Sequence, residues 1–188
     1  MERSPETDLR FQELYDGNFE AIRNFCIRRL PVEEVNDAVA EVFTIAWRRL
    51  PDIPTGDEQR MWLYGVARNV VRNTDRSIRR QTRLFGRLGG LAPSHDPGPE
   101  TVVVRRSEDD NVVAALRSLP ETDQEVLRLS AWEELTNVEI ANLLDLDPHA
   151  VTMRISRARN RLAKRLHMAT VPVQSSVEPY PVTGGGEQ

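Results

Sequence analysis

Residues 135–162 read LTNVEIANLLDLDPHAVTMRISRARNRL, and this stretch decides the architecture of the C-terminal half. Thr136 and Glu139 have the spacing of a capping box. In this motif the threonine hydroxyl accepts from the backbone amide of residue 139, and the glutamate carboxylate accepts from the backbone amide of residue 136. Asp147 followed by Pro148 indicates a second helix start, with the aspartate as N-cap and the proline at the first helical position. A short helix, a tight turn and a longer helix form a helix-turn-helix unit, which this stretch therefore predicts.

The longer helix of this unit combines a buried stripe with a basic surface. Val151, Ile155, Ala158 and Leu162 follow one another at spacings of 4, 3 and 4 residues, typical of the buried face of a helix. Residues 151–167 carry six basic side chains and no acidic one. The alternative is an ordinary helix pair with a solvated basic face, but the two helix starts together with the basic helix favour DNA binding in the major groove. The candidate contacts of this unit are Thr136, His149, Ala150, Thr152, Met153, Arg154, Ser156, Arg157, Arg159 and Arg161.

Individual positions on the longer helix suggest different contacts. Arg154 comes three residues after Val151 and one before Ile155, so we expect it to point away from the buried stripe and to bond guanine bidentately. Threonine and methionine side chains, here at positions 152 and 153, can meet a thymine methyl group. The arginines further along the helix are better placed to contact the phosphate backbone.

The N-terminal half is predicted to be helical throughout. A helical apolar stripe runs from Leu14 to Leu30, and Pro31 ends that helix. A second apolar stripe runs from Val35 to Leu50 at spacings of three and four residues. A third helix, residues 57–83, is apolar only in its first half and nearly all polar and arginine beyond. Such a helix packs at one end and presents charge at the other.

The second half of that third helix is the other basic region of the chain. Residues 68–87 hold seven arginines against one aspartate, a local net charge of +6 in a chain whose net charge is -4. Positive grooves lined by aromatic or arginine planes hold unstacked DNA bases. Trp47 and Trp62 lie on apolar stripes and are expected in the core, whereas Tyr64 and Asn69 are expected at the surface. The candidate contacts here are Tyr64, Arg68, Asn69, Arg72, Arg76, Arg79 and Arg80.

Two segments interrupt the helical pattern. Residues 84–100 contain four glycines and three prolines, so 84–107 is predicted to be a flexible linker. Residues 168–188 are again rich in proline and glycine and are predicted to form a disordered tail. The chain of 188 residues is therefore expected to be all-α, with two small helical domains, 8–83 and 108–167. The linker joins them, and the C-terminal domain contains the helix-turn-helix.

The composition argues against several other classes of protein. No apolar run approaches the ~18 residues that would span a bilayer, and the N-terminus MERSPETDLR has no apolar core of a secretory signal. The single cysteine, Cys26, fits a reducing cytoplasm. The three histidines lie far apart without metal-ligand spacing. With no nucleophile–base pair or phosphate-binding loop either, we expect a cytoplasmic protein that is not an enzyme and has no cofactor.

Three segments together resemble one protein family. They are DAVAEVFTIAWRR at 37–49, MWLYGVARNVV at 61–71, and residues 115–162, which run from ALRSLPETD to ARNRL. In this order, with a linker between the halves, they resemble the extracytoplasmic-function (ECF) sigma factors, the two-domain branch of the bacterial sigma-70 family. Two positions depart from the family pattern: Ala40 stands where glutamine is common, and Thr152–Met153 stand where lysine and serine are common. The second departure suggests an unusual promoter sequence.

The resemblance implies a function in transcription initiation. The chain would bind core RNA polymerase and promoter DNA, with the linker threading through polymerase. Residues 8–83 would bind polymerase and the -10 element, residues 149–157 would read the -35 element, and an anti-sigma factor would restrain the protein, as in many relatives. A stand-alone helix-turn-helix regulator remains the alternative, and an enzyme with a DNA-binding appendage is a more distant one. The residues expected to contact polymerase are Asn36, Asp37, Ala40, Glu41, Thr44 and Arg48.

Overall fold

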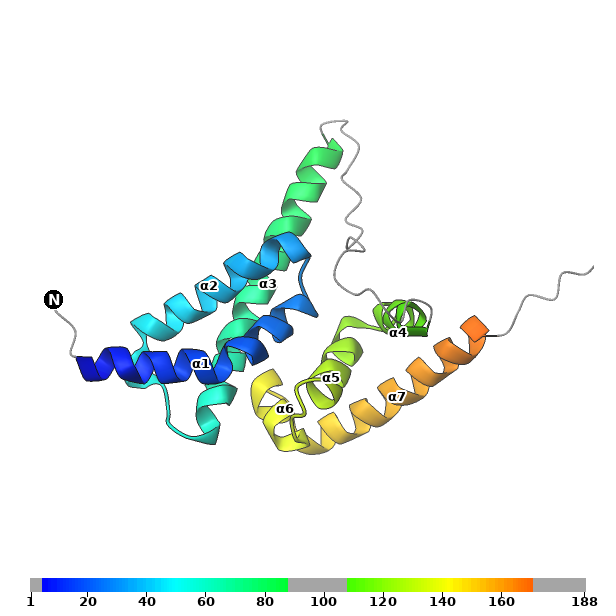
Figure 1. Cartoon of the computed structure of the whole chain (residues 1–188). Coiled ribbons are helices and arrows are strands. Elements are labelled where there is room, and N and C mark those ends of the chain that lie inside the picture. Colours follow the sequence, from blue (N-terminus) through cyan, green and yellow to red (C-terminus); the bar gives the residue numbers. More distant parts are fainter. Residues whose placement is uncertain (1–4, 88–107, 171–188) are drawn as a thin grey trace, which may run out of the picture.

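The computed structural model describes residues 5–87 and 108–170, which are helical with short connections (Figure 1). The elements are α1 (Pro5–Ile27), α2 (Val32–Arg48), the 3-10 turn η1 (Leu50–Asp52), α3 (Asp57–Arg87), α4 (Glu108–Arg117), α5 (Glu121–Ala131), α6 (Asn137–Leu144) and α7 (Pro148–Thr170). Within these ranges there is no strand, so the predicted all-α class is confirmed.

Both interruptions of the helical pattern begin later than the sequence suggests. Helix α3 continues to Arg87, into the predicted linker, and α7 continues to Thr170, into the predicted tail. A solvent-exposed helix can run on until its hydrogen bonding is stopped, and the first paired glycines come only at 89–90. The rest of the predicted linker, 88–107, and of the predicted tail, 171–188, lies outside the described residues.

Helices α1, α2 and α3 form the N-terminal unit. Its core includes Phe25, Val42 and Leu63, none of which exposes surface. Tyr64 belongs to this core as well: it is 1% exposed, and its ring centroid lies 5.4 Å from that of Phe25. The prediction that Tyr64 is exposed for contact with DNA is therefore wrong. The hydroxyl oxygen of Tyr64 is satisfied inside the unit, because it accepts from Nε and Nη2 of Arg60 at 3.1 and 2.9 Å.

The two tryptophans expected in the core are only half-buried. Trp47 meets the ring of Phe11 edge-on at 4.7 Å between centroids. The guanidinium of Arg49 lies 5.6 Å from the ring centroid of Trp62. Each indole thus closes the edge of the N-terminal unit rather than filling its centre.

Helices α4 to α7 form the C-terminal unit, and its predicted helix starts are confirmed. The Thr136 hydroxyl accepts from the amide of Glu139 at 3.3 Å, and a Glu139 carboxylate oxygen accepts from the Thr136 amide at 2.7 Å. At the start of α7, Oδ1 of Asp147 accepts from the amides of His149 and Ala150 at 2.8 and 3.1 Å. Between these helices Asp145 adopts the left-handed conformation, with φ of 56°, and thereby makes the tight turn.

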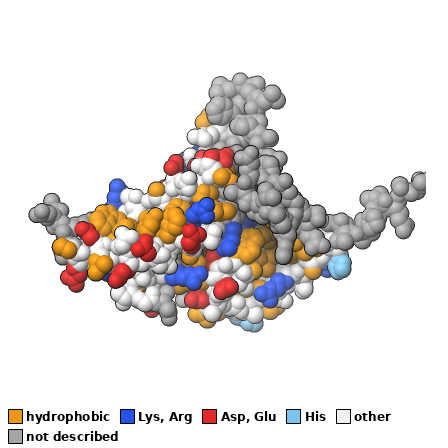
Figure 2. Space-filling view, in the orientation of Figure 1, with side chains coloured by type: hydrophobic (Ala, Val, Ile, Leu, Met, Phe, Trp, Pro, Cys, Tyr) orange, Lys and Arg blue, Asp and Glu red, His pale blue; other side chains and the backbone are white. Residues whose placement is uncertain are grey.

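The two units pack against each other, which the prediction of two pieces on a flexible linker does not include. Figure 1 shows α5 and α6 beside α3 and the C-terminal end of α1. A Cβ placed on Gly65 of α3 would lie 4.0 Å from Cδ1 of Leu143 in α6. The buried apolar residues of both units accordingly form one continuous cluster. On the face shown in Figure 2, acidic side chains are spread over the N-terminal unit and several basic ones lie toward the junction.

Candidate nucleic-acid interface

The outer face of α7 is the first basic surface. Val151, Ile155 and Ala158 are buried against the rest of the C-terminal unit, and Leu162 at the end of the predicted stripe is half-buried, so the stripe is confirmed over its first three members. Because that stripe fixes the rotation of the helix, the positions between its members face outward. Eight of the predicted contacts on α7 are exposed: His149, Ala150, Thr152, Met153, Ser156, Arg157, Arg159 and Arg161.

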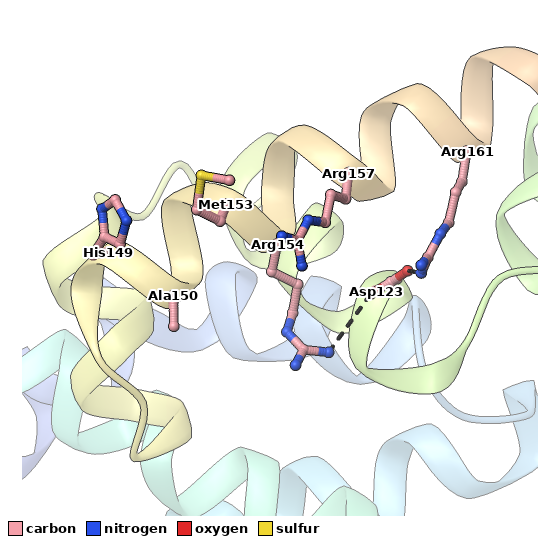
Figure 3. A pocket seen from close by; sticks show the side chains of 7 residues that line it. All are labelled: Asp123, His149, Ala150, Met153, Arg154, Arg157 and Arg161. Atoms are coloured by element: carbon pink, nitrogen blue, oxygen red, sulfur yellow. Dashed lines mark hydrogen bonds and ion pairs between the residues drawn. The ribbon is translucent and has the colours of Figure 1, made fainter.

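A hollow of about 520 Å³ lies along this surface, and its lining side chains point in different directions (Figure 3). His149, Met153 and Arg157 lie on one side of the helix in this view, whereas Arg154 and Arg161 reach toward α5. The exposed imidazole, thioether and guanidinium together offer donors and an apolar contact to a groove of DNA. The N-terminal half of α7 is therefore the part of this helix that is best equipped to read bases.

The structure places Arg154 differently from the prediction. Its Nη1 donates to the Thr122 hydroxyl oxygen at 2.8 Å and lies 3.7 Å from Oδ1 of Asp123. Nη1 of Arg161 pairs with Oδ2 of the same carboxylate. Asp123 is only 3% exposed, and a buried carboxylate strongly favours nearby cations. The attraction of that carboxylate explains why Arg154 lies along α5 instead of projecting from the helix.

Two other predicted contacts of the C-terminal unit already have partners within it. The Thr152 hydroxyl accepts from Nδ2 of Asn137 at 2.9 Å and donates to the Pro148 carbonyl oxygen at 3.0 Å. Thr136 is exposed but is occupied by its capping box. Hydrogen bonds from the side chain and backbone of Thr136 lower the pKa of Glu139. The Asn137–Thr152 bond links the two helices of the helix-turn-helix, and the capping box fixes the start of the first.

The basic half of α3 is the second basic surface. Asn69, Arg72, Arg76, Arg79 and Arg80 are exposed, as predicted, and Arg68 is half-buried. Nε of Arg79 lies 2.8 Å from Oδ2 of Asp75, one turn earlier, and this hydrogen bond raises the pKa of Arg79. Burial lowers the pKa of Arg68, and the positive charge of Arg72 lowers it further. On this surface Arg68 and Arg72 are thus close enough for their charges to oppose each other.

The junction between the units contains a buried ion-pair cluster that the sequence analysis missed. Nη1 of Arg29 lies 2.8 Å from Oε1 of Glu133, and Nε of Arg29 lies 3.1 Å from Oε2 of Glu125. The side chains of Arg29 and Glu133 are 4% and 1% exposed. Burial acts to lower the pKa of Arg29, but the two glutamates outweigh it and raise the pKa above its usual value. Arg28 adds a longer contact to Glu133, at 3.4 Å.

The face of α2 predicted to bind polymerase lies on the N-terminal unit, away from its apolar stripe. Val35, Val39, Val42 and Ala46 are buried, so that stripe is confirmed. All six predicted contacts, Asn36, Asp37, Ala40, Glu41, Thr44 and Arg48, are exposed.

The described residues, 5–87 and 108–170, offer little for metal binding, membrane insertion or thiol chemistry. This part of the chain holds no cluster of histidine, cysteine and acidic side chains that would bind a metal ion. Likewise, none of the described helices combines the length and the apolar character needed to cross a bilayer. Cys26 is fully buried, and burial raises the pKa of its thiol to about 11.

Comparison with known proteins places this architecture in a family. The sequence model described as "Sigma-70, region 4" matches residues 109–162. The RNA polymerase sigma factor CnrH of Cupriavidus metallidurans is 34% identical over 154 residues, which cover 78% of this chain and 79% of CnrH. The ECF RNA polymerase sigma factor SigW of Bacillus subtilis is 25% identical over 83% of this chain and 88% of SigW.

A solved structure shares the fold. The sigma factor RpoE from Bartonella quintana, crystallised with the anti-sigma factor NepR, matches with a TM-score of 0.63 at 21% identity. The match covers 84% of this chain and 96% of RpoE. Together with the extended identity to CnrH, the helix-turn-helix and the N-terminal three-helix unit, this shows that the chain belongs to the extracytoplasmic-function sigma factors of the sigma-70 family.

Proposed function

We propose that this sigma factor binds core RNA polymerase through α2, reads the -35 promoter element with α7 and holds the -10 element with α3. The observation that carries the proposal is the exposed outer face of α7, set on a helix-turn-helix within the region matched by the sigma-70 family. In this assignment residues 8–83 and 108–167 act as the two DNA-contacting domains, and 84–107 connects them within the polymerase.

The -35 element is read mainly by the first turns of α7. Arg157 is exposed beside Met153, and an arginine in the major groove bonds O6 and N7 of guanine. Met153 and Thr152 meet thymine methyl groups. Arg159 contacts phosphate. Arg154 and Arg161 support the helix from their places against α5, where both lie beside the carboxylate of Asp123.

The -10 element lies along the basic half of α3. Arg72, Arg76 and Arg80 are exposed on successive turns, a spacing suited to phosphates of one strand. Asn69 offers a side-chain amide to a base edge. Tyr64 has no part in this contact because it is buried in the core.

The exposed face of α2 docks on polymerase. Asp37 and Glu41 lie one turn apart on this face, and acidic side chains at the rim of an interface accelerate association with a basic partner. The protein contributes binding and positioning rather than a chemical step of its own, and acts in the cytoplasm, where polymerase and promoter are found.

An anti-sigma factor is a further partner in this proposal. RpoE from Bartonella quintana binds NepR, and the fold of that sigma factor is shared by this chain. A protein that binds both units at once would withhold them from polymerase and promoter.

Run-off transcription tests the proposal. Purified core polymerase with this protein should give discrete transcripts from a library of genomic fragments, and neither component should do so alone. A gel shift with and without core polymerase provides the comparison with a stand-alone regulator. Specific binding by the isolated chain at physiological salt, with no dependence on polymerase, would show the regulator instead.

Charge reversal tests the polymerase face. Asp37→Arg with Glu41→Arg should weaken binding to core polymerase, mainly by slowing association, and leave the circular dichroism spectrum unchanged. Glu13→Arg with Glu20→Arg is the matched control, since these acids are exposed on α1 outside the proposed face. Equal losses from the two double variants would mean that only net charge matters.

A further inference from the structure

The junction between the two units encloses a second cleft, which shares only Arg154 with the hollow along α7. Its volume is about 560 Å³, within the range of ~300–1,000 Å³ that is usual for small-molecule sites. The walls come from α3 on one side and from α5 with the start of α7 on the other. Six arginines line it: Arg29, Arg68, Arg72, Arg79, Arg128 and Arg154.

Three of these arginines have polar or acidic partners among their neighbours. Arg29 pairs with Glu125 and Glu133, Arg79 pairs with Asp75, and Arg154 bonds Thr122 and lies near Asp123. The remaining three, Arg68, Arg72 and Arg128, form no ion pair with a carboxylate in the described parts of the chain. Three carboxylates, those of Asp75, Glu121 and Glu125, line the same cleft, so its six arginines leave a net lining charge of +3.

Arg128 combines one side-chain hydrogen bond with one buried nitrogen that has no partner. Its Nη2 donates to Oε1 of Gln124 at 2.9 Å, but its Nε is buried without a hydrogen-bond partner. Burial lowers the pKa of Arg128, and the positive charge of Arg29 adds to this effect. Arg68, on the opposite wall, has its pKa lowered by burial and by Arg72. A buried donor without an acceptor costs free energy, and an anion held near Arg68 and Arg128 would offset the repulsion among the guanidinium groups.

We propose that this cleft binds the diphosphate group of a small molecule, held between Arg68 and Arg72 of α3 and Arg128 of α5. Guanidinium groups bond phosphate oxygens in pairs, and three of them on two facing walls suit a ligand with two adjacent phosphates. The volume leaves room for an attached nucleoside, so free pyrophosphate and a nucleoside diphosphate are two sources of the same chemistry.

Binding in the cleft has a consequence for the promoter contacts. Because the ligand joins α3 to α5, it stabilises the packed arrangement of the two units. It also occupies Arg68 and Arg72, which the proposed function assigns to the -10 element. The ligand is therefore expected to oppose promoter engagement by α3, and this consequence rests on the proposed function, whereas binding itself does not.

Calorimetric titration of the full chain tests the binding. Inorganic pyrophosphate and adenosine diphosphate are titrated at constant ionic strength without divalent metal, with adenosine as the ligand that lacks phosphate. Saturable binding of either phosphate compound supports the site, and a preference between them identifies the source. Absence of saturable binding by both, or equal binding of adenosine, overturns the proposal.

Matched variants locate the site. Arg128→Gln should weaken pyrophosphate binding about tenfold or more, because it removes a charge-assisted pair from one wall. Arg128→Lys keeps the positive charge but loses the paired N–H donors of the guanidinium. Its affinity for pyrophosphate is expected to lie between that of the parent and that of Arg128→Gln. Arg23→Gln removes the same charge from α1, outside the cleft, and should bind as the parent does. Equal weakening by Arg23→Gln would show a general charge effect and overturn the site.

Run-off transcription with Arg128→Gln separates the two proposals. Arg128 has no assigned promoter or polymerase contact, so transcription by its holoenzyme without added ligand should match that of the parent. Pyrophosphate binding by the parent can be measured even if no promoter is found, and transcription can be measured even if no ligand binds. Failure of one proposal is therefore distinguishable from failure of the other.

Discussion

The two basic surfaces carry the same residue type but have different neighbours. Around the outer face of α7, Met153 and Arg157 lie open to solvent. The basic half of α3 instead borders the cleft closed by α5, where Glu121 and Glu125 face it. A count of arginines along the sequence makes these surfaces look equivalent. The availability of a charged surface therefore depends on what packs opposite it.

The difference follows from how the units are joined. Arg29, two residues after α1, is held by two glutamates of the C-terminal unit, so α5 is held against the N-terminal unit. DNA can approach the outer face of α7 without any movement of this junction. DNA that approaches Arg68 on α3 meets the wall formed by α5, and we expect the units to separate first.

Removing a buried ion-pair partner at the junction should give the largest change in stability and in the packing of the two units. Glu133→Ala leaves the Arg29 guanidinium with Glu125 alone and should cost about 3 kcal/mol in the free energy of unfolding. Urea unfolding followed by circular dichroism measures this, and small-angle scattering should show a larger radius of gyration. Asp52→Ala is the control, because the Arg49–Asp52 pair is more than half exposed and should contribute about 1 kcal/mol or less. Similar costs for both variants would mean that the junction does not hold the units together.

The second prediction concerns the two arginines of α7 whose surroundings differ. Arg157→Ala should relax the preferred -35 sequence at one base pair, at a cost of about 1–3 kcal/mol for the preferred base. Arg154→Ala should leave the preference unchanged and lower the melting temperature, because its guanidinium bonds Thr122. Holoenzyme binding to a library randomised at the -35 element measures both. If Arg154→Ala changes the preferred base and Arg157→Ala does not, Arg154 must leave α5 when DNA binds.

The third prediction tests α6, which lies between the two basic surfaces and contacts both α3 and α7. Thr136→Ala removes the capping box and should cost about 1 kcal/mol at neutral pH. The pKa of Glu139 is lowered in the folded protein, so its share of this stability is present above the ordinary pKa and is lost as the pH falls through the lowered value. Thermal unfolding of parent and variant at pH 7 and at about pH 3 should therefore show a smaller difference in the acid. A constant difference would assign the whole effect to the threonine hydroxyl.

The smallest effect is expected from adding a methyl group at a glycine where α3 packs against α6. Gly65→Ala replaces a glycine in α3 and should raise the free energy of unfolding by about 0.5–1 kcal/mol, since its new Cβ meets Leu143 at an ordinary contact distance. Gly17→Ala in α1 is the matched control in open space and should give a similar gain. A gain at Gly17 together with a loss at Gly65 would show that α3 and α6 pack more closely than this contact allows.

Features set by local sequence could be predicted, and those set by distant partners could not. Helix periods and caps depend on residues a few positions apart, so the buried stripe of α7 and the starts of α6 and α7 could be predicted from the sequence. Asp123 and Arg29 depend on partners more than thirty residues away, and neither has a local signal. Tyr64 is different: it is spaced three and seven residues from Ala67 and Val71, which are buried, and this period indicates a core position.

The buried thiol of Cys26 makes the chain well suited to site-directed labelling. With a pKa of about 11, only about one thiol in ten thousand is ionised at pH 7, and the thiolate is the form that reacts. Maleimide dyes should therefore leave the folded parent unmodified, and no cysteine has to be removed first. One new cysteine on the outer side of α3 and one on α4 would then report the distance between the units during binding to polymerase, promoter or pyrophosphate.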